Sequence, residues 1–268
     1  MRSKPKVTVL IPCRDGEKTL RNTIISLLNQ TADTYIAVAD DASVDSTSTI
    51  LKEFSATSKV LSVRYPRREP RNYARVPVLL NMILNVYPDS DFFMISGDDS
   101  VYPKNYISMI TEFMNKEKVD IASGYFENYN PTSVPSGSGR VISSNFFKKI
   151  TPFPPNIGWE SWVLYKALSL GRKVAVYPIK FQHIRKYSIQ SLWTFGHSAY
   201  LNGTPLIFTI GRSVKAFLFK EHTLLGALAI VSGHVEYILR HPTTLDTAQF
   251  VNELQKWRIK SKILTRIN

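Results

Sequence analysis

Cysteine is almost absent from this sequence. Cys13 is the single cysteine in 268 residues, which excludes an internal disulfide framework and any zinc site built from cysteines. A chain without disulfides fits a reducing compartment. Residues 1–6 are basic and polar, so no apolar segment typical of a secretory signal precedes the first apolar run. We therefore expect a cytoplasmic protein.

The sequence also lacks an apolar run long enough to cross a membrane, which requires about 20 residues. Residues 206–219 are apolar but contain Arg212 and Lys215, and residues 224–231 are nearly uncharged but short. Apolar helices flanked by lysine and arginine are typical of helices that lie in a membrane interface. One expectation is therefore peripheral contact with the inner face of a membrane. A helical cap packing on the sheet and a homodimer contact are the alternatives.

Acidic residues are scarce compared with basic ones. The chain has 34 Lys and Arg against 21 Asp and Glu, a formal net charge of +13. Such an excess predicts an anionic partner, and nucleic acid, a phosphorylated substrate and an anionic membrane would all satisfy it. Arginines concentrate in residues 64–75, which a uniformly solvated basic surface does not explain well.

What the sequence does contain is an alternation of short apolar runs with helical periodicity. Leu20, Ile24, Leu27 and Leu28 form one apolar stripe of a helix. Strands alternating with helices of this length indicate βαβ units, hence an α/β fold with a mostly parallel, Rossmann-like sheet and helices on both faces. From residue 188 the pattern is helical only. We therefore expect an α/β domain over residues 1–187 and a helical region over residues 188–268. The expected strands are residues 6–11, 35–39, 60–65, 91–96, 119–126 and 174–178.

Carboxylates follow several of these strands, at the sheet edge where α/β proteins bind ligands. Asp40 and Asp41 follow the second strand, and Asp98 and Asp99 follow the fourth. Two adjacent ionised carboxylates repel each other, so a metal ion, an arginine or a positive substrate is expected to offset the repulsion. No Gly-x-Gly-x-x-Gly follows the first strand, which argues against a Rossmann dinucleotide site and a P-loop.

Three segments stand out by their order and spacing: Val9 to Asp15, Val38 to Thr47, and Ile95 to Asp99 with Pro103. Together they resemble the inverting family 2 glycosyltransferases of the GT-A fold, and the similarity spans roughly residues 5–185. The resemblance implies a nucleotide-diphosphate sugar donor, UDP- or GDP-linked. It also implies transfer to an acceptor hydroxyl or phosphate on a glycan or a lipid-linked molecule.

The resemblance also implies roles for individual residues. Asp40 and Asp41 would contact the nucleotide, with Arg71 and Arg75 near its base or diphosphate. Asp98 and Asp99 would hold Mn2+ or Mg2+, with His183 as a third ligand, and Glu160 would deprotonate the acceptor. The remaining positions expected to line the donor site are Pro12, Cys13, Asp15 and Gly97. Residues 128–139 are expected to form a loop over the site.

Two serines depart from the family's pattern. Ser96 stands where the family's D-x-D motif begins, and Ser161 stands where many relatives carry an aspartate. A binding protein that keeps the fold without turnover therefore remains an alternative. Gly97, Asp98 and Asp99 also match the palm motif of RNA-dependent polymerases, but the palm requires another aspartate motif upstream and a longer chain. We expect no nucleic-acid partner.

Overall fold

The computed structural model describes residues 4–87, 89–127, 134–185 and 188–267. The chain forms two compact units, the first comprising Met1–Pro155 with Gly171–Lys186 and the second comprising Asn156–Leu170 with Tyr187–Asn268. The division into an α/β domain and a C-terminal region with separate roles stays a prediction. In the structure, residues 156–170 group with the helical unit rather than with the sheet.

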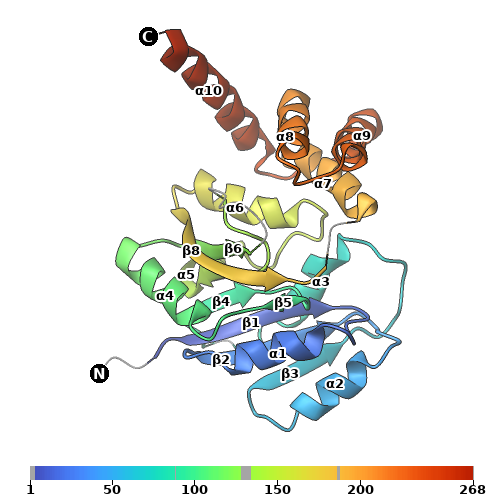
Figure 1. Ribbon diagram of the computed structural model, residues 1–268, viewed down its shortest axis with the longest axis vertical. Coiled ribbons are helices and arrows are strands. Elements are labelled where there is room, and N and C mark those ends of the chain that lie inside the picture. Colours follow the sequence, from blue (N-terminus) through green and yellow to red (C-terminus); the bar gives the residue numbers. More distant parts are fainter. Residues whose placement is uncertain (1–3, 88, 128–133, 186–187, 268) are drawn as a thin grey trace. The chain divides into compact units, whose positions relative to one another are not determined.

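The first unit is built on a mixed, mainly parallel sheet (Figure 1). Its strand order is β3-β2-β1-β4-β7-β6-β8-β5. Strands β3, β2, β1 and β4 pair in parallel, whereas β7 pairs antiparallel with both β4 and β6. The strands are β1 (Lys6–Cys13), β2 (Asp33–Asp40), β3 (Val60–Arg64), β4 (Phe92–Ile95), β5 (Ser100–Val101), β6 (Ile121–Phe126), β7 (Arg140–Ser143) and β8 (Val174–His183).

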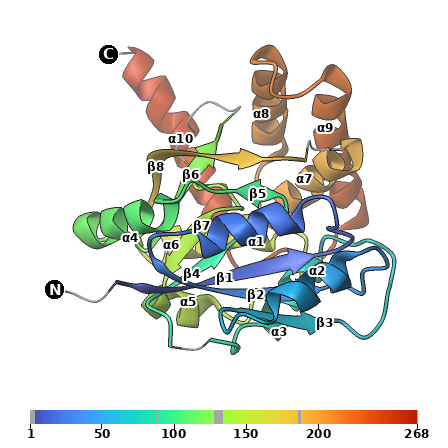
Figure 2. The ribbon, with the colours of Figure 1, turned by 60° about the horizontal axis from the view of Figure 1, so that its bottom comes forward.

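Helices cover both faces of this sheet (Figure 2). The apolar stripes of α1 (Leu20–Leu28), α2 (Thr47–Phe54) and α4 (Tyr106–Glu117) join Val7, Val9 and Ile11 of β1 in one buried cluster. On the other face, α5 (Ser144–Ile150) stacks Phe147 on Phe93 of β4 at 4.0 Å between ring centroids. Helix α3 (Arg75–Met82) is tied to the segment after α5 by a pair of hydrogen bonds between Asn81 and Phe153.

The register of the sheet decides where the acidic residues lie. Cys13 at the end of β1 pairs with Asp40 at the end of β2, and Leu10 pairs with Ile95 at the end of β4. Because these three strands are parallel, their carboxyl ends meet at the same edge of the sheet. The loops that carry Asp15, Asp41 and Asp98 therefore start from neighbouring points.

The second unit is helical in its described residues. Helices α7 and α9 approach very closely, since a Cβ on Gly196 would lie 2.0 Å from the carbonyl oxygen of Ile230 and one on Gly233 would lie 2.1 Å from that of Trp193. None of the helices in the described ranges is long and apolar enough to cross a membrane. The helices are α6 (Trp159–Ser169), α7 (Ile189–Leu201), α8 (Leu206–Leu218), α9 (Leu224–Arg240) and α10 (Ala248–Ile267).

The predicted fold class is confirmed: the protein is α/β with a mainly parallel sheet, helices on both faces and C-terminal helices. Two strands were not predicted. The antiparallel strand β7 lies in a segment of mixed polarity, and β5 is only two residues long. Of the predicted loop over residues 128–139, residues 128–133 lie outside the described part of the chain.

Candidate functional site

Asp98 and Asp99 lie directly after β4, and both are buried with a relative exposure of 7%. Gly97 precedes them, and a Cβ at this position would lie 2.6 Å from Oδ1 of Asp99, so a larger residue would displace that carboxylate. The backbone carbonyl of Asp98 accepts a hydrogen bond from the hydroxyl of Thr23 on α1 at 3.0 Å. The two carboxylates are thus held by the sheet edge and by α1 rather than by a free loop.

The loop after β1 closes around Asp98. The Cys13 thiol donates to Oδ2 of Asp98 at 3.3 Å, and burial together with the Asp98 charge raises the pKa of Cys13. Gly16 is close as well, because a Cβ there would lie 2.6 Å from the Cys13 sulfur and 2.8 Å from Oδ2 of Asp98. Cys13 therefore acts as a neutral donor to the carboxylate.

Arg185 is the cation that faces this acidic pair. Its guanidinium bonds Oδ1 of Asp98 and lies 3.1 Å from Oδ2 of Asp99. Strand β8 brings it there, since β5 and β8 pair antiparallel with Ser100 opposite His183. His183 Nε2 lies 3.5 Å from Oδ2 of Asp99. The end of β8 and the residues directly after it thus supply His183 and Arg185 to the acidic edge.

The Asp98 and Asp99 end of the site could hold a divalent cation if a bound phosphate group supplied some of the coordinating oxygens. Burial raises the pKa of Asp99, and the neighbouring Asp98 adds to this, while His183 and Arg185 oppose it. Two buried carboxylates offer the oxygen atoms that a hard cation prefers, and Arg185 is the group that a cation would have to displace from them. Within the described residues, however, no group of three acidic, histidine or cysteine side chains could hold a metal. Two carboxylates would therefore need phosphate oxygens and water to complete the coordination, as magnesium sites commonly do.

Asp40 and Asp41 lie at the end of β2 and are also buried, each with arginine partners. Asp40 accepts from Arg64 at 2.5 Å and from the backbone nitrogen of Ser43 at 3.0 Å. Asp41 accepts from Arg14 at 3.1 Å and from Nε of Arg75 at 2.5 Å. These pairs fix both carboxylates at the same sheet edge as Asp98.

Asp15 is gripped by the same basic segment. Arg68 donates to its two carboxylate oxygens at 3.0 and 2.8 Å, and Arg71 lies 3.4 Å away. These bonds, chiefly that from Arg68, hold the pKa of Asp15 well below its usual range. The backbone of Asp15 is left-handed, with φ 53°. The concentration of arginines seen in the sequence therefore surrounds the acidic loops rather than a separate surface.

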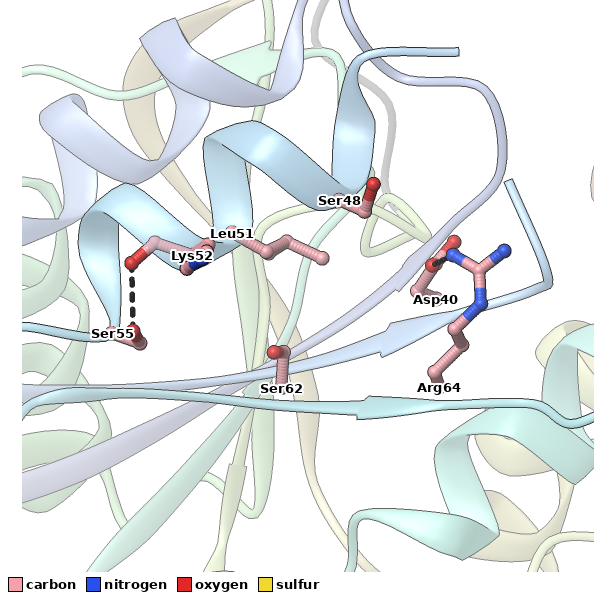
Figure 3. A pocket seen from close by; sticks show the side chains of 7 residues that line it. All are labelled: Asp40, Ser48, Leu51, Lys52, Ser55, Ser62 and Arg64. Carbon is pink, nitrogen blue, oxygen red and sulfur yellow. Dashed lines mark hydrogen bonds and ion pairs between the residues drawn. The ribbon is translucent and has the colours of Figure 1, made fainter. Parts of the chain in front are cut away.

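A hollow lies between α2 and the ends of β2 and β3 (Figure 3). Asp40 and Arg64 form an ion pair at one end of it, and the remaining lining residues come from α2, from the residue that ends it and from β3. Asp98 and Asp99 do not line it, so the hollow extends the Asp40 end of the site and is not its centre. The lining residues are Asp40, Ser48, Leu51, Lys52, Ser55, Ser62 and Arg64.

The described end of the predicted loop contacts the acidic turn. Ser138 accepts a hydrogen bond from the backbone nitrogen of Gly97 at 2.9 Å, and its hydroxyl also lies 2.7 Å from that of Ser100. Tyr102 completes this cluster with its hydroxyl 2.9 Å from that of Ser138. Residues near 138 therefore hold the turn that carries Asp98 and Asp99.

Arg75 is bonded entirely within the protein, which the sequence did not indicate. Its guanidinium bonds Asp41, Glu69 at 2.6 Å and the carbonyl oxygen of Arg67 at 2.8 Å, and it lies over the Tyr65 ring at 4.1 Å. A donor contact by Arg75 stays a prediction. The described bonds themselves make it a residue that positions Asp41.

We expect Arg75→Met to lower the free energy of unfolding by roughly 2–4 kcal/mol, because it leaves the buried Asp41 without its shortest ion pair. Arg71→Met is the matched control, since Arg71 is exposed and its contact with Asp15 is long. That control should change stability by less than about 0.5 kcal/mol. Urea unfolding of both variants measures the difference. Equal losses in the two would show that Arg75 has no special structural role.

Glu160 lies in the first turn of α6 and is solvent-exposed. It belongs to the helical unit, whereas the carboxylates described above belong to the sheet unit. The neighbouring Trp159 and Trp162 are buried, and the Trp162 indole donates to Asp246 at 2.5 Å. The two rings are therefore committed to the core of the helical unit. The role of Glu160 as a base stays a prediction.

Comparison with known proteins decides the family. The family model described as glycosyl transferase family 2 matches residues 8–179. The chain belongs to glycosyl transferase family 2. The matched region contains the loops that carry Asp15, Asp40, Asp41, Asp98 and Asp99, and also Glu160. Family membership sets aside the polymerase-palm alternative.

Solved structures of glycosyltransferases share the fold. A mannosyltransferase from Pyrobaculum calidifontis, PcManGT, in complex with GDP-Man and Mn2+, matches with a TM-score of 0.63 and 14% identity, covering 96% of this chain and 81% of that one. S. aureus TarS matches with a TM-score of 0.56 and 16% identity, covering 74% of this chain but only 39% of TarS. TarS 1–349 in complex with UDP-GlcNAc matches at 0.56 and 14% identity, with coverages of 73% and 66%. This chain thus spans less than two thirds of the TarS chains. No curated protein matches it.

Several residues of the candidate site were not identified from the sequence. Arg185 was counted among the basic residues without a role, yet it pairs with both carboxylates of the acidic turn. Arg14, Arg64 and Arg68 were likewise not assigned, although each bonds one of the acidic loops. The available signal was weak: each of these arginines follows or flanks a strand end, where an acidic loop is expected.

Proposed function

We propose that this protein is an inverting, metal-dependent glycosyltransferase that uses a UDP- or GDP-linked sugar. The observation that carries the proposal is the convergence, at one sheet edge, of the Asp40 and Asp41 pair, the Asp98 and Asp99 pair and a ring of arginines. The solved complexes of PcManGT with GDP-Man and of TarS with UDP-GlcNAc support a nucleotide sugar as the donor class.

In this proposal the nucleoside lies toward Asp40 and the hollow beside α2, and the diphosphate lies toward Asp98. Asp40 accepts hydrogen bonds from the base or ribose. Arg68 and Arg71 are exposed enough to bond phosphate oxygens, and a planar guanidinium can bond two such oxygens at once. The Asp40–Arg64 pair lets the protein present an acceptor and a donor group side by side.

Asp98 and Asp99 are the residues that would hold Mn2+ or Mg2+, and His183 is proposed to assist from the end of β8. A bound divalent ion would neutralise the charge that develops on the departing diphosphate. Arg185 currently bonds both carboxylates. The Arg185 side chain is 43% exposed, so its guanidinium could also donate hydrogen bonds to oxygens of the departing diphosphate.

Glu160 is the proposed general base. It would accept the proton of the acceptor hydroxyl while that oxygen attacks the anomeric carbon from the side opposite the diphosphate, which inverts the configuration there. A product of inverted anomeric configuration, observed by NMR, is the expected stereochemical outcome.

A second function, donor binding without turnover, is favoured by two observations. The carboxylates that would hold the metal are already neutralised by Arg185, and Ser96 replaces the first acid of the D-x-D pattern. Donor binding without transfer or hydrolysis across a panel of acceptors would establish this function in place of the first.

The proposed function is tested by melting temperatures measured with a panel of nucleotide-diphosphate sugars, with Mn2+ and with a chelator. A ligand that binds only the native state raises the melting temperature by mass action. We expect a rise of several degrees with one UDP- or GDP-linked sugar, larger with Mn2+ than with the chelator. No response to any nucleotide sugar in either condition would contradict the proposal.

A further inference from the structure

Helix α8 buries small polar residues and exposes large aliphatic ones, which is the reverse of the usual pattern in a water-soluble protein. Its buried residues are Thr209 and Ser213, and the Thr209 hydroxyl lies 2.8 Å from Nδ1 of the buried His234 on α9. Large aliphatic side chains recur every three or four residues on its exposed side, which makes them one face of the helix. The stripe consists of Ile207, Ile210, Val214 and Leu218.

Helix α9 repeats the pattern. It buries Gly226, Ala227, Gly233 and His234, and Gly233 allows the close approach to α7. Its exposed stripe consists of Leu224, Leu225, Leu228, Val235 and Leu239. Across the two stripes the side chains are between 37% and 74% exposed. Both helices therefore keep small and polar residues inside and aliphatic residues outside.

Such a pattern has a physical meaning. Water-soluble helices bury their aliphatic face, and large exposed apolar patches mark interaction surfaces. Small and hydrogen-bonding residues between helices, with aliphatic side chains facing outward, are typical of helices whose outer surface lies in lipid. Further large apolar side chains are exposed at the end of α8 and the start of α9, namely Phe217, Phe219 and Leu225.

The exposed charges on α8 and in the turn after it select the kind of lipid. Arg212, Lys215 and Lys220 are all exposed, and Glu221 is the single acidic residue between positions 206 and 228. Basic side chains next to an apolar stripe add attraction to anionic headgroups. In a two-fold contact between copies, the same basic residues would face each other, which disfavours a second copy as the occupant.

We propose that the exposed stripes of α8 and α9 dock the protein on an anionic lipid bilayer. With 13 and 17 residues, the helices are about 20 and 25 Å long, shorter than the ~30 Å hydrocarbon core. They therefore insert their aliphatic faces into one leaflet and do not cross. This inference rests on the helical unit and does not depend on sugar transfer.

The test is flotation of the full chain with vesicles made of equal parts phosphatidylcholine and phosphatidylglycerol. The wild type should float with these vesicles. The double variant Leu218→Gln with Leu225→Gln should partition at least about tenfold more weakly, because two aliphatic side chains no longer enter the hydrocarbon. The matched control is Leu61→Gln with Leu170→Gln, which changes two leucines of 47% and 50% exposure outside α8 and α9. The control should float like the wild type.

The charge contribution is tested separately. Lys215→Gln with Lys220→Gln should weaken flotation roughly tenfold, as should added salt, and pure phosphatidylcholine should bind less than the mixed vesicles.

Failure of the wild type to float, or equal loss in the control pair, overturns the proposal. It is also overturned if light scattering shows a dimer that Leu218→Gln with Leu225→Gln converts to a monomer while no vesicles bind. Melting temperatures with nucleotide sugars, measured on the same variants, keep this outcome separate from that of the proposed function.

Discussion

Asp98→Asn should lower kcat/KM for sugar transfer by at least about 100-fold and remove the manganese dependence of donor binding. The substitution keeps the size of the side chain but removes the charge that faces Arg185 and that a divalent ion requires. Electrostatic groups aimed at the charge of a transition state typically contribute this much. The Cys13 thiol can still donate to the amide oxygen, so the fold around the turn should persist.

The measurement combines initial rates of transfer with donor titrations in Mn2+ and in chelator. Asp33→Asn is the matched control, because Asp33 is an aspartate at the other end of a strand, paired with Lys59 at 2.8 Å on the surface. The control should retain wild-type rates and manganese dependence. If Asp98→Asn keeps full manganese-dependent donor affinity, the metal end has been placed at the wrong residue.

Glu160→Gln is the second substitution with a large expected effect. The amide matches the carboxylate in size but cannot accept the acceptor's proton, so kcat should fall by about a thousandfold. The donor does not need this carboxylate for binding, and its dissociation constant should therefore change little. A loss confined to kcat distinguishes a base from a residue that merely binds substrate.

Single-turnover rates and donor titrations measure the two quantities. Glu253→Gln offers a control in the same helical unit, since Glu253 lies on α10 and accepts from Gln249 at 3.3 Å. It should leave kcat unchanged. A Glu160→Gln enzyme with activity within a few-fold of wild type would remove Glu160 from the mechanism, and a parallel loss of donor affinity would point to a folding or binding role instead.

The first half of the fold was predictable because its sequence pattern is local. Strands β1, β2 and β4 contain apolar runs, and β1 and β2 are each followed by a helix with an apolar stripe. Parallel pairing then fixes which ends meet, so the approach of Asp40 to Cys13 follows from strand order alone. The acidic edge of the site could therefore be predicted from sequence.

The basic part of the site could not be predicted from sequence, because it depends on pairing between strands that are far apart in the chain. Arg185 reaches Asp98 only because β8 pairs antiparallel with the two-residue strand β5. No local pattern marks so short a strand. Arg75 lies where a donor contact was expected, but its donors bond Asp41, Glu69 and a backbone carbonyl. Sequence spacing indicated that Arg75 lies near the acidic loops, but it did not reveal which groups its guanidinium bonds.

The C-terminal helices show a different limit. Apolar content predicted that α8 and α9 would be helices with an apolar face, but it did not indicate which face is buried. Only the packing of α8 with α9 reveals that Thr209 and Ser213 are buried while Leu218 is exposed. The exposed stripes, rather than the apolar content, carry the inference of a lipid-docking surface.

The most direct test of the central claim is a crystal structure with Mn2+ and UDP or GDP, using anomalous diffraction at the manganese edge. The account predicts one manganese peak within coordinating distance of Asp98, bridged to the diphosphate, with the nucleoside beside Asp40. A nucleotide bound away from these carboxylates, or a diphosphate held by Arg185 without any manganese peak, would contradict it.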